Sequence, residues 1–341
     1  MKDVIANQFI RFGEQCKNYS PMYEFFSYKI AKDDLLLDLC TYVKEGQPIP
    51  NLLFAAVQFL LYKGYDHPLK TFYPSIVDEP KEHKHAFPYF RDFCQKFKQE
   101  IIHLLQTKNV QTNEVRRCTF LYPCFSKIYK MTRQPLALIE IGTSAGLQLL
   151  FDQYSYSYST EKRYGNVKSN VHLSTKIRGK SKPVLSENSP PVQLRIGIDL
   201  NIVDLSKDED RLWLLALIWP EHEDRRKKFI EASNYFLKHK SMIEFIEGDG
   251  VQLLPSIMKN IPTNSTLCIF HTFVANQMSK EVRQTLLETI KKIGQQRDVF
   301  HLYNHITDSL LHLDYYINGR EYTTTIADID DHGQAFTWLC N

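Results

Sequence analysis

The chain has 341 residues, and 43% of them are hydrophobic, so it can bury a substantial core and lacks the composition of a disordered protein. Its formal charge of +3 gives no global electrostatic argument for nucleic-acid binding. The seven cysteines form no C-x-x-C pair, and their odd number fits reduced thiols in a cytosol. The sequence shows no signal-peptide pattern and no apolar run near the ~20 residues of a membrane span. We therefore expect a cytoplasmic protein without a membrane segment.

The region 1–133 is predicted to be helical. Apolar residues recur there at three- and four-residue spacing, as in "YEFFSYKIAKDDLLLDLCTYV" and "FPYFRDFCQKFKQEIIHLLQTK". The stretch "QTNEV" predicts a helix start, with Thr112 or Asn113 as the cap and Glu114 in the first turn. A second interpretation makes the same stretch a polar lid over a cofactor, in which Asn113 and Glu114 contact a substrate.

The region 134–341 has the alternating texture of an α/β domain. The run "LALIEI" is almost continuously apolar, as expected of a parallel strand that is buried on both faces. Similar runs are "LRIGIDL", "IEFIEG", "TLCIFH" and "DVFHLY", with long helical patterns between the later ones, the first spanning 208–239. This alternation predicts βαβ units and a mostly parallel sheet, finished by an antiparallel strand pair around Gly319 and Gly333.

One segment, at about 153–193, interrupts this pattern and is interpreted as an insertion with a strand pair and a loop. Within it, residues 161–182 hold seven lysines and arginines and one acid. A solvated loop and a mobile arm that meets an anionic substrate are both open interpretations. A nucleic-acid partner has no support beyond this charge, because base-stacking and groove-reading motifs are not evident.

The stretch "IEIGTSAG" contains the pattern G-x-S-x-G, which can form a nucleophile elbow with Ser144 as the attacking group. A catalytic base is available later in the chain, at His332 in "DDHG". The oxyanion hole is harder to find, because no glycine-rich turn after an earlier strand precedes the motif. A Ser144 hydrolase is therefore kept as an alternative.

A cofactor site explains more of the pattern. Ligands bind at the C-terminal ends of strands in open α/β sheets, so such a site predicts acids there. Glu140 ends the first strand, Asp199 closes the second, and Asp249 follows the third. Gly142 and Gly146 stand where the backbone must turn tightly near a ligand.

Glu140-x-Gly142-x-Ser144-x-Gly146 resembles the first motif, E/D-x-G-x-G-x-G, of class I S-adenosylmethionine-dependent methyltransferases. This resemblance covers roughly 135–303. Ser144 departs from it by replacing the central glycine. Asp199 lies 53 residues after Gly146, whereas a fingerprint glycine is normally followed by its ribose acid about 20 residues on.

A second resemblance covers nearly the whole chain. It is to the bacterial family called domain of unknown function 2332, and it is carried by "SPMYEFF", "PNLLFAAVQFLL", "HPLKTFYPS", "LALIEIGTSAGLQLLFDQY", "GIDLNIVDL" and "DDHGQAFTWL". It implies a Rossmann-like, methyltransferase-type core behind a helical N-terminal part, and it implies no assigned reaction.

The methyltransferase resemblance implies roles for the motif residues. The turn with Gly142, Ser144 and Gly146 would pass under the methionine end of S-adenosylmethionine, with backbone N–H groups at a helix start facing its carboxylate. Glu140 would hold the ammonium group of the cofactor. Asp199 would accept hydrogen bonds from the ribose hydroxyls, with Asn201 assisting. Asp249 would accept from the adenine amine. Turn chemistry alone also accounts for Asp249.

On the acceptor side, His271 ends the fourth strand and would act as a base if the nucleophile must lose a proton; a structural histidine is the alternative. Thr272 and Asn276 would contact the substrate. A metal is not expected, because His83 and His85 lack further ligands at zinc-site spacing. We therefore expect a cytosolic S-adenosylmethionine-dependent methyltransferase with a small-molecule substrate. The alternatives are a non-catalytic protein that binds this cofactor or a nucleotide, and the hydrolase.

Overall fold

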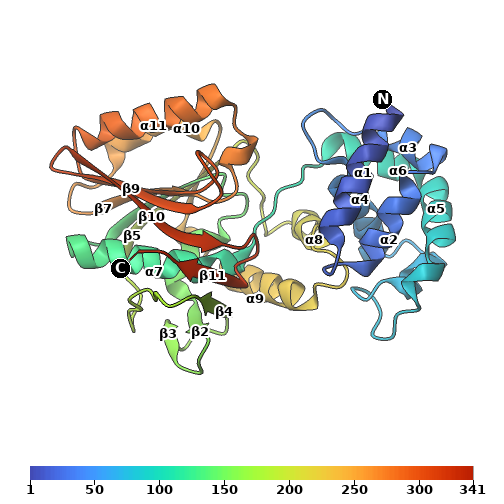
Figure 1. Ribbon diagram of the computed structural model, residues 1–341, viewed down its shortest axis with the longest axis horizontal. Helices are drawn as coiled ribbons and strands as arrows, with labels where there is room; N and C mark the ends of the chain where they lie inside the picture. The colour runs from blue at the N-terminus through green and yellow to red at the C-terminus, as the bar shows by residue number, and fades with distance from the viewer. Residues whose placement is uncertain (341) are drawn as a thin grey trace. The chain divides into compact units, whose positions relative to one another are not determined.

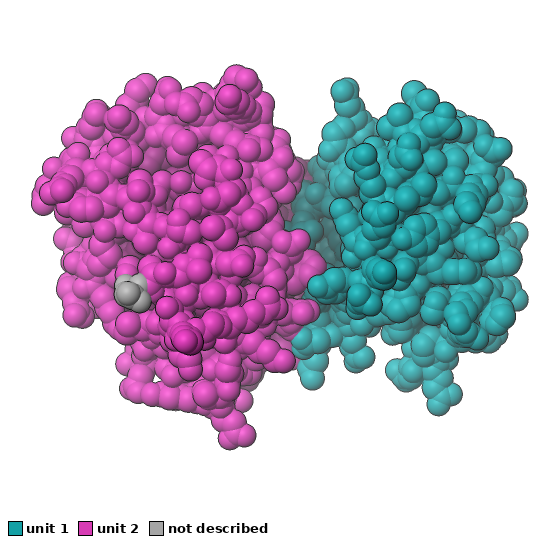
Figure 2. Space-filling view, in the orientation of Figure 1, with its two compact units in different colours: residues 1–112, 206–227 teal, residues 113–205, 228–341 magenta. Residues whose placement is uncertain are grey.

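The computed structural model describes residues 1–340 and divides into two units (Figures 1 and 2). Unit 1 contains Met1–Thr112 and Ser206–Lys227, and unit 2 contains Asn113–Leu205 and the chain from Lys228 onwards. These bounds differ from a division at 133/134. The segment 113–133 packs with the sheet, and a segment from the middle of the chain packs with the N-terminal helices.

Unit 1 is helical. Its α-helices are α1 (Lys2–Cys16), α2 (Pro21–Ile30), α3 (Asp34–Cys40), α4 (Ile49–Tyr62), α5 (Phe87–Lys96), α6 (Lys98–Thr107) and α8 (Asp208–Ala216), with the short 3-10 helices η1 (Pro68–Phe72) and η2 (His83–His85) between them. Helix α4 is apolar on all sides apart from Asn51 in its first turn and Gln58, and its side chains belong to the core that the other helices build.

The segment 206–227 joins unit 1 through buried hydrogen bonds. Gln58 Nε2 donates to the carbonyl oxygens of Ala216 and Ile218 at 2.9 and 2.7 Å. The helical pattern over 208–239 predicts one helix, and this prediction is wrong. Helix α8 ends at Ala216 and α9 (Glu223–His239) begins after Pro220, because proline cannot donate the backbone hydrogen bond that a continuing helix needs.

Unit 2 is built on a mixed, mostly parallel sheet of eleven strands. The strands are β1 (Leu136–Ile141), β2 (Ser155–Tyr158), β3 (Arg163–Gly165), β4 (His172–Arg178), β5 (Val192–Asp199), β6 (Glu244–Glu247), β7 (Thr266–His271), β8 (Val299–Tyr303), β9 (Leu311–Ile317), β10 (Arg320–Ile329) and β11 (Ala335–Trp338). Their order is β3-β2-β4-β11-β10-β9-β8-β7-β1-β5-β6. The α/β fold class expected from the alternating pattern is confirmed.

Five neighbouring strands, β6-β5-β1-β7-β8, are parallel. The chain runs outward from β1 to β5 and β6, and then crosses to the other side of β1 to form β7 and β8. The connections therefore reverse between β1 and β7, which is the place where open α/β sheets form a ligand crevice. Helices α10 (Gly250–Ile257) and α11 (Lys280–Gly294) cover one face of the sheet, and α7 (Cys118–Thr132) lies on the other (Figure 1).

The antiparallel end of the sheet is larger than the predicted strand pair. Strands β9, β10 and β11 are all antiparallel to the strand before them, with turns at Asn318-Gly319 and at 331–333. The segment 153–193 supplies β2, β3 and β4, and β4 pairs in parallel with β11. The insertion is thus part of the same sheet.

No helix within residues 1–340 is both long enough and apolar enough to cross a membrane.

Candidate functional site

The turn after β1 is the centre of the candidate site. Gly142 and Gly146 have φ of +73° and +74°, which glycine adopts without strain. Both also make room for side chains of the protein. A Cβ on Gly142 would lie 2.4 Å from Val274 Cγ2, and one on Gly146 would lie 2.8 Å from Phe245 Cζ. These two glycines therefore already have a packing role within the chain.

Four of the five N–H groups in the turn donate inside the chain. Those of Gly142 and Thr143 both bind the carbonyl oxygen of Ile198 at 2.8 and 3.1 Å. The N–H of Ser144 binds Asp199 Oδ2 at 2.7 Å, and that of Gly146 binds the carbonyl oxygen of Thr143 at 2.8 Å. The turn is thereby fixed to the end of β5.

The α-helix predicted after this turn is not formed. The chain continues as the 3-10 helix η4 (Leu147–Gln153), in which Leu150 has non-helical dihedral angles, and then enters β2. Within the described residues, no α-helix therefore begins after this turn to present a row of backbone N–H groups. A ligand at the turn has to be held mainly by side chains.

Glu140, the fifth residue of β1, is buried with 3% of its surface exposed. Its Oε2 accepts a hydrogen bond from Thr143 Oγ1 at 2.6 Å, and within residues 1–340 it makes no ion pair. Burial raises the pKa of Glu140 to about 8, and the nearby Asp199 adds to this rise, while the Thr143 hydrogen bond and the more distant Arg117 oppose it. Glu140 is therefore a carboxyl group without a matching cation.

Asp199 ends β5 beside this carboxyl group. Its Oδ2 accepts from the Ser144 N–H and its Oδ1 from the Asn201 N–H, at 2.7 and 3.0 Å. Burial raises the pKa of Asp199, and these backbone hydrogen bonds oppose the rise. The structure therefore brings together the predicted residues Glu140, Ser144, Asp199 and Asn201.

Asp249 follows β6 and is the N-cap of α10. Its Oδ1 accepts from the N–H groups of Val251 and Gln252 at 2.9 and 3.3 Å. The N–H of Gly248 donates to the carbonyl oxygen of Asp199 at 2.8 Å, so the ends of β5 and β6 are in contact. Asp249 therefore has a local structural role as a helix cap, and its cofactor role stays a prediction.

The helix cap predicted before η3 (Val115–Arg117) lies later in the chain than expected. Glu114, not Thr112 or Asn113, is the N-cap, and its Oε1 accepts from the Arg116 N–H at 3.1 Å. Asn113 instead reaches the turn, where its Nδ2 donates to the carbonyl oxygen of Thr143 at 2.8 Å. This contact supports the lid interpretation of Asn113.

Two side-chain oxygens at the turn have no hydrogen-bond partner among the described residues. They are Ser144 Oγ, on a residue that is 4% exposed, and Asn113 Oδ1. Buried polar atoms are normally paired with protein, water or ligand. Together with Glu140, they form a polar group at the turn that a bound molecule would complete.

The acceptor-side residues lie on β7 and the loop after it. His271 is fully buried, and its Nε2 is 3.3 Å from His301 Nε2, while its Nδ1 has no hydrogen-bond partner within residues 1–340. Burial lowers the pKa of His271 to about 3. Thr272 Oγ1 donates to Gln148 Oε1 at 3.2 Å, and Asn276 is exposed on the short helix η7 (Ala275–Gln277).

Sequence reasoning missed Arg117 and the residues after β8. The Arg117 guanidinium lies 4.1 Å from the Phe273 ring centroid, and Arg117 Nε donates to the carbonyl oxygen of Asp331 at 3.0 Å. The Phe273 N–H donates to Asn304 Oδ1 at 2.8 Å. The missed signal was the run "YNHI" directly after a predicted strand, where polar residues reach the same edge as His271.

Three adjacent strands are followed by a residue in the left-handed conformation. Ser144 follows β1 with φ of +52°, Phe273 follows β7 with +58°, and His305 follows β8 with +63°. Such a backbone costs about 1–3 kcal/mol at a residue other than glycine and clusters at functional sites. The strain therefore marks the edge formed by β1, β7 and β8.

The hydrolase alternative meets only part of its structural requirements. Strand β1 has neighbours on both sides, and Ser144 has the strained backbone expected of an elbow. Ser144 Oγ makes no hydrogen bond among the described residues, so His332 does not act as its base in this structure. The second predicted triad element is therefore not in place.

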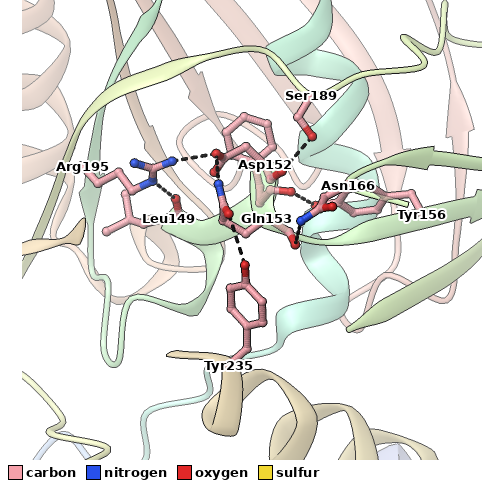
Figure 3. Close-up of polar contacts among 9 residues, drawn as sticks. Leu149, Asp152, Gln153, Tyr156, Asn166, Ser189, Arg195 and Tyr235 are labelled. Carbon is pink, nitrogen blue, oxygen red and sulfur yellow. Dashed lines mark hydrogen bonds and ion pairs between the residues drawn. The ribbon is translucent and has the colours of Figure 1, made fainter. Parts of the chain in front are cut away.

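A buried ion pair joins β5 to η4 at the two ends of the segment 153–193 (Figure 3). Arg195 Nη2 donates to Asp152 Oδ2 at 2.7 Å, and both side chains are less than 10% exposed. Ser189 Oγ donates to the carbonyl oxygen of Asp152 at 2.8 Å, and Asn166 Nδ2 to that of Gln153 at 3.3 Å. The insertion is thus tied to η4 at two points.

Within the part of the chain that the structure describes, no three histidine, cysteine or acidic residues are placed to hold a metal ion.

The chain matches one protein-family model, described as an uncharacterised protein conserved in bacteria (DUF2332), over residues 6–338. No curated protein and no solved structure matches the chain. The match spans nearly all of the helical unit and the sheet unit that hold the residues described above. The chain therefore belongs to the DUF2332 family of uncharacterised bacterial proteins.

Proposed function

We propose that this protein is an S-adenosylmethionine-dependent methyltransferase that acts on a small-molecule acceptor. The observation that carries the proposal is the buried Glu140 carboxyl group at the end of the central strand, beside the turn and Asp199. It makes no ion pair with any of residues 1–340. A buried acid is costly unless a cation or hydrogen-bond donors neutralise it. The ammonium group of the cofactor is a cation of the right kind.

The position of the group supports this choice of cofactor. Glu140 and Asp199 end neighbouring parallel strands, and the connections of the sheet reverse next to β1. Nucleotide-containing cofactors bind at such points in doubly wound folds. The strands β6-β5-β1-β7-β8 form in the chain order third, second, first, fourth, fifth, as in a Rossmann-like sheet.

The turn also limits how the cofactor is held. Gly142 and Gly146 face Val274 and Phe245, and four N–H groups of the turn are already used. The residues that would hold the cofactor are therefore side chains with free capacity: Glu140 for the ammonium group, and Ser144 Oγ and Asn113 Oδ1 for its other polar atoms. Asp199 and Asp249 carry carboxylate oxygens, which are acceptors for hydroxyl and amine groups.

The bound cofactor would supply an activated methyl group, so the protein has to bind, orient and exclude water rather than form a covalent intermediate. Thr143 holds the Glu140 carboxyl group in place, and Asp199 fixes the turn through Ser144. His271 would take up a proton where the acceptor loses one.

The test is calorimetric titration of the full chain with S-adenosylmethionine and with S-adenosylhomocysteine. We expect micromolar binding that Glu140→Gln weakens at least tenfold, because glutamine keeps the Thr143 hydrogen bond but cannot offer a negative charge. Glu244→Gln, an exposed acid at the opposite end of β6 from the candidate site, is the matched control and should bind as the wild type does. No heat with either ligand in the wild type would contradict the proposal.

Proton release gives a second readout. Because the pKa of Glu140 is raised to about 8, most copies carry a proton at pH 7, and an ammonium group that binds there expels it. We expect most of one proton to be released per cofactor bound at pH 7, measured in buffers of different ionisation enthalpy. The release should vanish in Glu140→Gln.

A Ser144 hydrolase is the second candidate, because the left-handed backbone of Ser144 is shared with nucleophile elbows. A panel of short-chain esters separates the two. Hydrolysis that is lost in Ser144→Ala, together with no cofactor binding, would favour the hydrolase.

A further inference from the structure

A line of buried polar side chains crosses three neighbouring strands next to the candidate site. His271 on β7 and His301 on β8 are both fully buried, and their Nε2 atoms are 3.3 Å apart. His301 lies directly opposite Asp314 on β9 in the register of the sheet, so their side chains share a face. Asp314 is held by the Tyr303 hydroxyl, which donates to its Oδ2 at 2.7 Å.

Three atoms along this line have no hydrogen-bond partner among the described residues: His271 Nδ1, His301 Nδ1 and Asp314 Oδ1. Each such atom, when buried, costs about 1–3 kcal/mol if it stays unpaired. Three orphaned atoms on one line are more than packing alone explains.

Proton counting constrains the two imidazoles. Burial lowers the pKa of both His271 and His301, so each ring is neutral at pH 7 and carries one N–H. The contact between the two Nε2 atoms needs one N–H and one lone pair. One ring therefore has a bare Nδ1, and the other has an Nδ1–H. One of the two Nδ1 atoms is therefore a buried base and the other a buried donor, and the tautomers of His271 and His301 decide which ring has which role.

Asp314 favours one of the two tautomers. Directly opposite residues on antiparallel strands have Cβ atoms about 4.5–5.5 Å apart, which lets Asp314 Oδ1 accept from His301 Nδ1–H through one water. His301 then offers its Nε2 lone pair to the Nε2–H of His271. The Nδ1 of His271, on the last residue of β7, is left as the base.

We infer that Asp314 and His301 are positioning residues that hold His271 with a bare Nδ1, and that this nitrogen takes the proton of an alcohol or phenol acceptor. The inference rests on the proposed methyl transfer. The proton would pass to His271 Nδ1, and the electron pair of the broken O–H bond would form the new bond from oxygen to the methyl carbon. The bond between that carbon and the cofactor sulfur would break at the same time, and its electron pair would stay on sulfur, which loses its positive charge. His271 keeps its Nε2–H bond to His301.

The acceptor class follows from the surroundings. A nucleophile here has to be neutral, because the desolvation that disfavours charged imidazole also disfavours a protonated amine. His271 has no exposed surface, so the acceptor reaches Nδ1 only when the loop 272–277 moves. The titratable groups nearest the line are Tyr303, which stacks on His301 at 4.5 Å, His312, which stacks on Tyr303 at 5.3 Å, and His305, which contributes to the lowered pKa of His271.

The test is long-range ¹H–¹⁵N correlation NMR of the full chain labelled at histidine. We expect His271 to carry its proton on Nε2 and His301 on Nδ1. His301→Leu should leave His271 without a preferred tautomer, whereas His301→Gln should restore it, because its amide oxygen can accept from Nε2–H. Asp314→Asn should lower the share of His301 with Nδ1–H. His239→Gln, on α9, is the control and should leave the His271 signals unchanged.

Two outcomes would overturn the inference: a wild-type His271 with its proton on Nδ1, or a tautomer that His301→Leu does not alter in a folded protein. Titration with S-adenosylhomocysteine separates this failure from that of the proposed function. If S-adenosylhomocysteine binds but His271 carries its proton on Nδ1, only the positioning role of Asp314 and His301 is refuted. No binding with the expected tautomer removes the methyl transfer and with it the role of His271 as its base.

Discussion

The strands of the candidate site carry two kinds of buried ionisable group at their C-terminal ends: an acid half on β1 and β5, and an imidazole half on β7 and β8. Burial shifts the pKa values of the two halves in opposite directions. On β1 and β5, Glu140 and Asp199 are acids whose pKa is raised by burial. On β7 and β8, His271 and His301 are imidazoles whose pKa is lowered by burial. Burial therefore disfavours the charged form in both sets of residues. A bound cation would favour ionisation of Glu140, whereas the two imidazoles are neutral at pH 7. The comparison teaches that one desolvated edge can prepare a cation site and a base side by side.

The largest loss of stability is expected at the buried ion pair between Arg195, on β5, and Asp152, on η4. Arg195→Met leaves the Asp152 carboxylate buried and unpaired, which should lower the free energy of unfolding by about 3–5 kcal/mol. The double variant Arg195→Met, Asp152→Leu should recover most of this loss. Urea unfolding of both variants measures it, and equal losses in the two would show that the charge is not the cause.

The turn itself gives the next effect. Gly142→Ala combines a left-handed backbone with a clash against Val274 and should cost about 2–4 kcal/mol. Gly319→Ala, in the β9–β10 turn, has φ of +74° with no atom near its Cβ, and should cost only about 1 kcal/mol. Thermal unfolding of the pair separates packing from backbone strain. Similar costs at both sites would mean that Val274 moves freely.

The acid half can also be tested through pH. The pKa of Glu140 is raised in the folded state, so its stabilising contribution is complete below the unfolded value of 4.5 and is lost as pH rises through about 8. Glu140→Gln should therefore gain about 2 kcal/mol over the wild type between pH 6 and 8. Denaturant titrations at the two pH values check this, and an unchanged difference would mean that Glu140 is ionised throughout.

The imidazole half should show the opposite slope. The pKa of His271 is lowered, so its contribution is complete above the unfolded value of 6.5 and is lost as pH falls toward about 3. Between pH 6.5 and 5 the wild type should lose about 1–2 kcal/mol that His271→Gln does not lose. His85→Gln, an exposed histidine, is the control and should behave like the wild type. A wild-type slope that His271→Gln retains would contradict the prediction.

Periodicity predicted the parallel strands well because these runs are buried on both faces and so read as continuous apolar stretches. "LALIEI" and "TLCIFH" became β1 and β7 as expected. It failed where tertiary pairing decides the structure. The strands β2, β3 and β4 are short and polar on one side. Strand β4 pairs with β11, and 157 positions separate Arg178, the last residue of β4, from Ala335, the first residue of β11. A pairing at that distance leaves no local pattern.

The candidate site was predicted in part for the same reason. Acids at strand ends follow from chain order, so Glu140 and Asp199 were found. The role of Asn113 depends on a contact with Thr143 that spacing does not encode, and the pairing of His301 with His271 depends on the register of β7 and β8. Residues that act through a neighbour on another strand are visible only once the strand order is known.

The position of β11 has a consequence for synthesis of the chain. This strand ends at Trp338 and lies between β10 and β4, so it joins the strands of the segment 153–193 to the rest of the sheet. During translation from the N-terminus, β4 is made long before β11, and the edge of β4 that pairs with β11 stays open until β11 has left the ribosome. Unpaired edges promote association between chains. Loss of β11 would therefore expose the edges of β4 and β10 at once, and nascent chains that stall before β11 is made should be prone to aggregate.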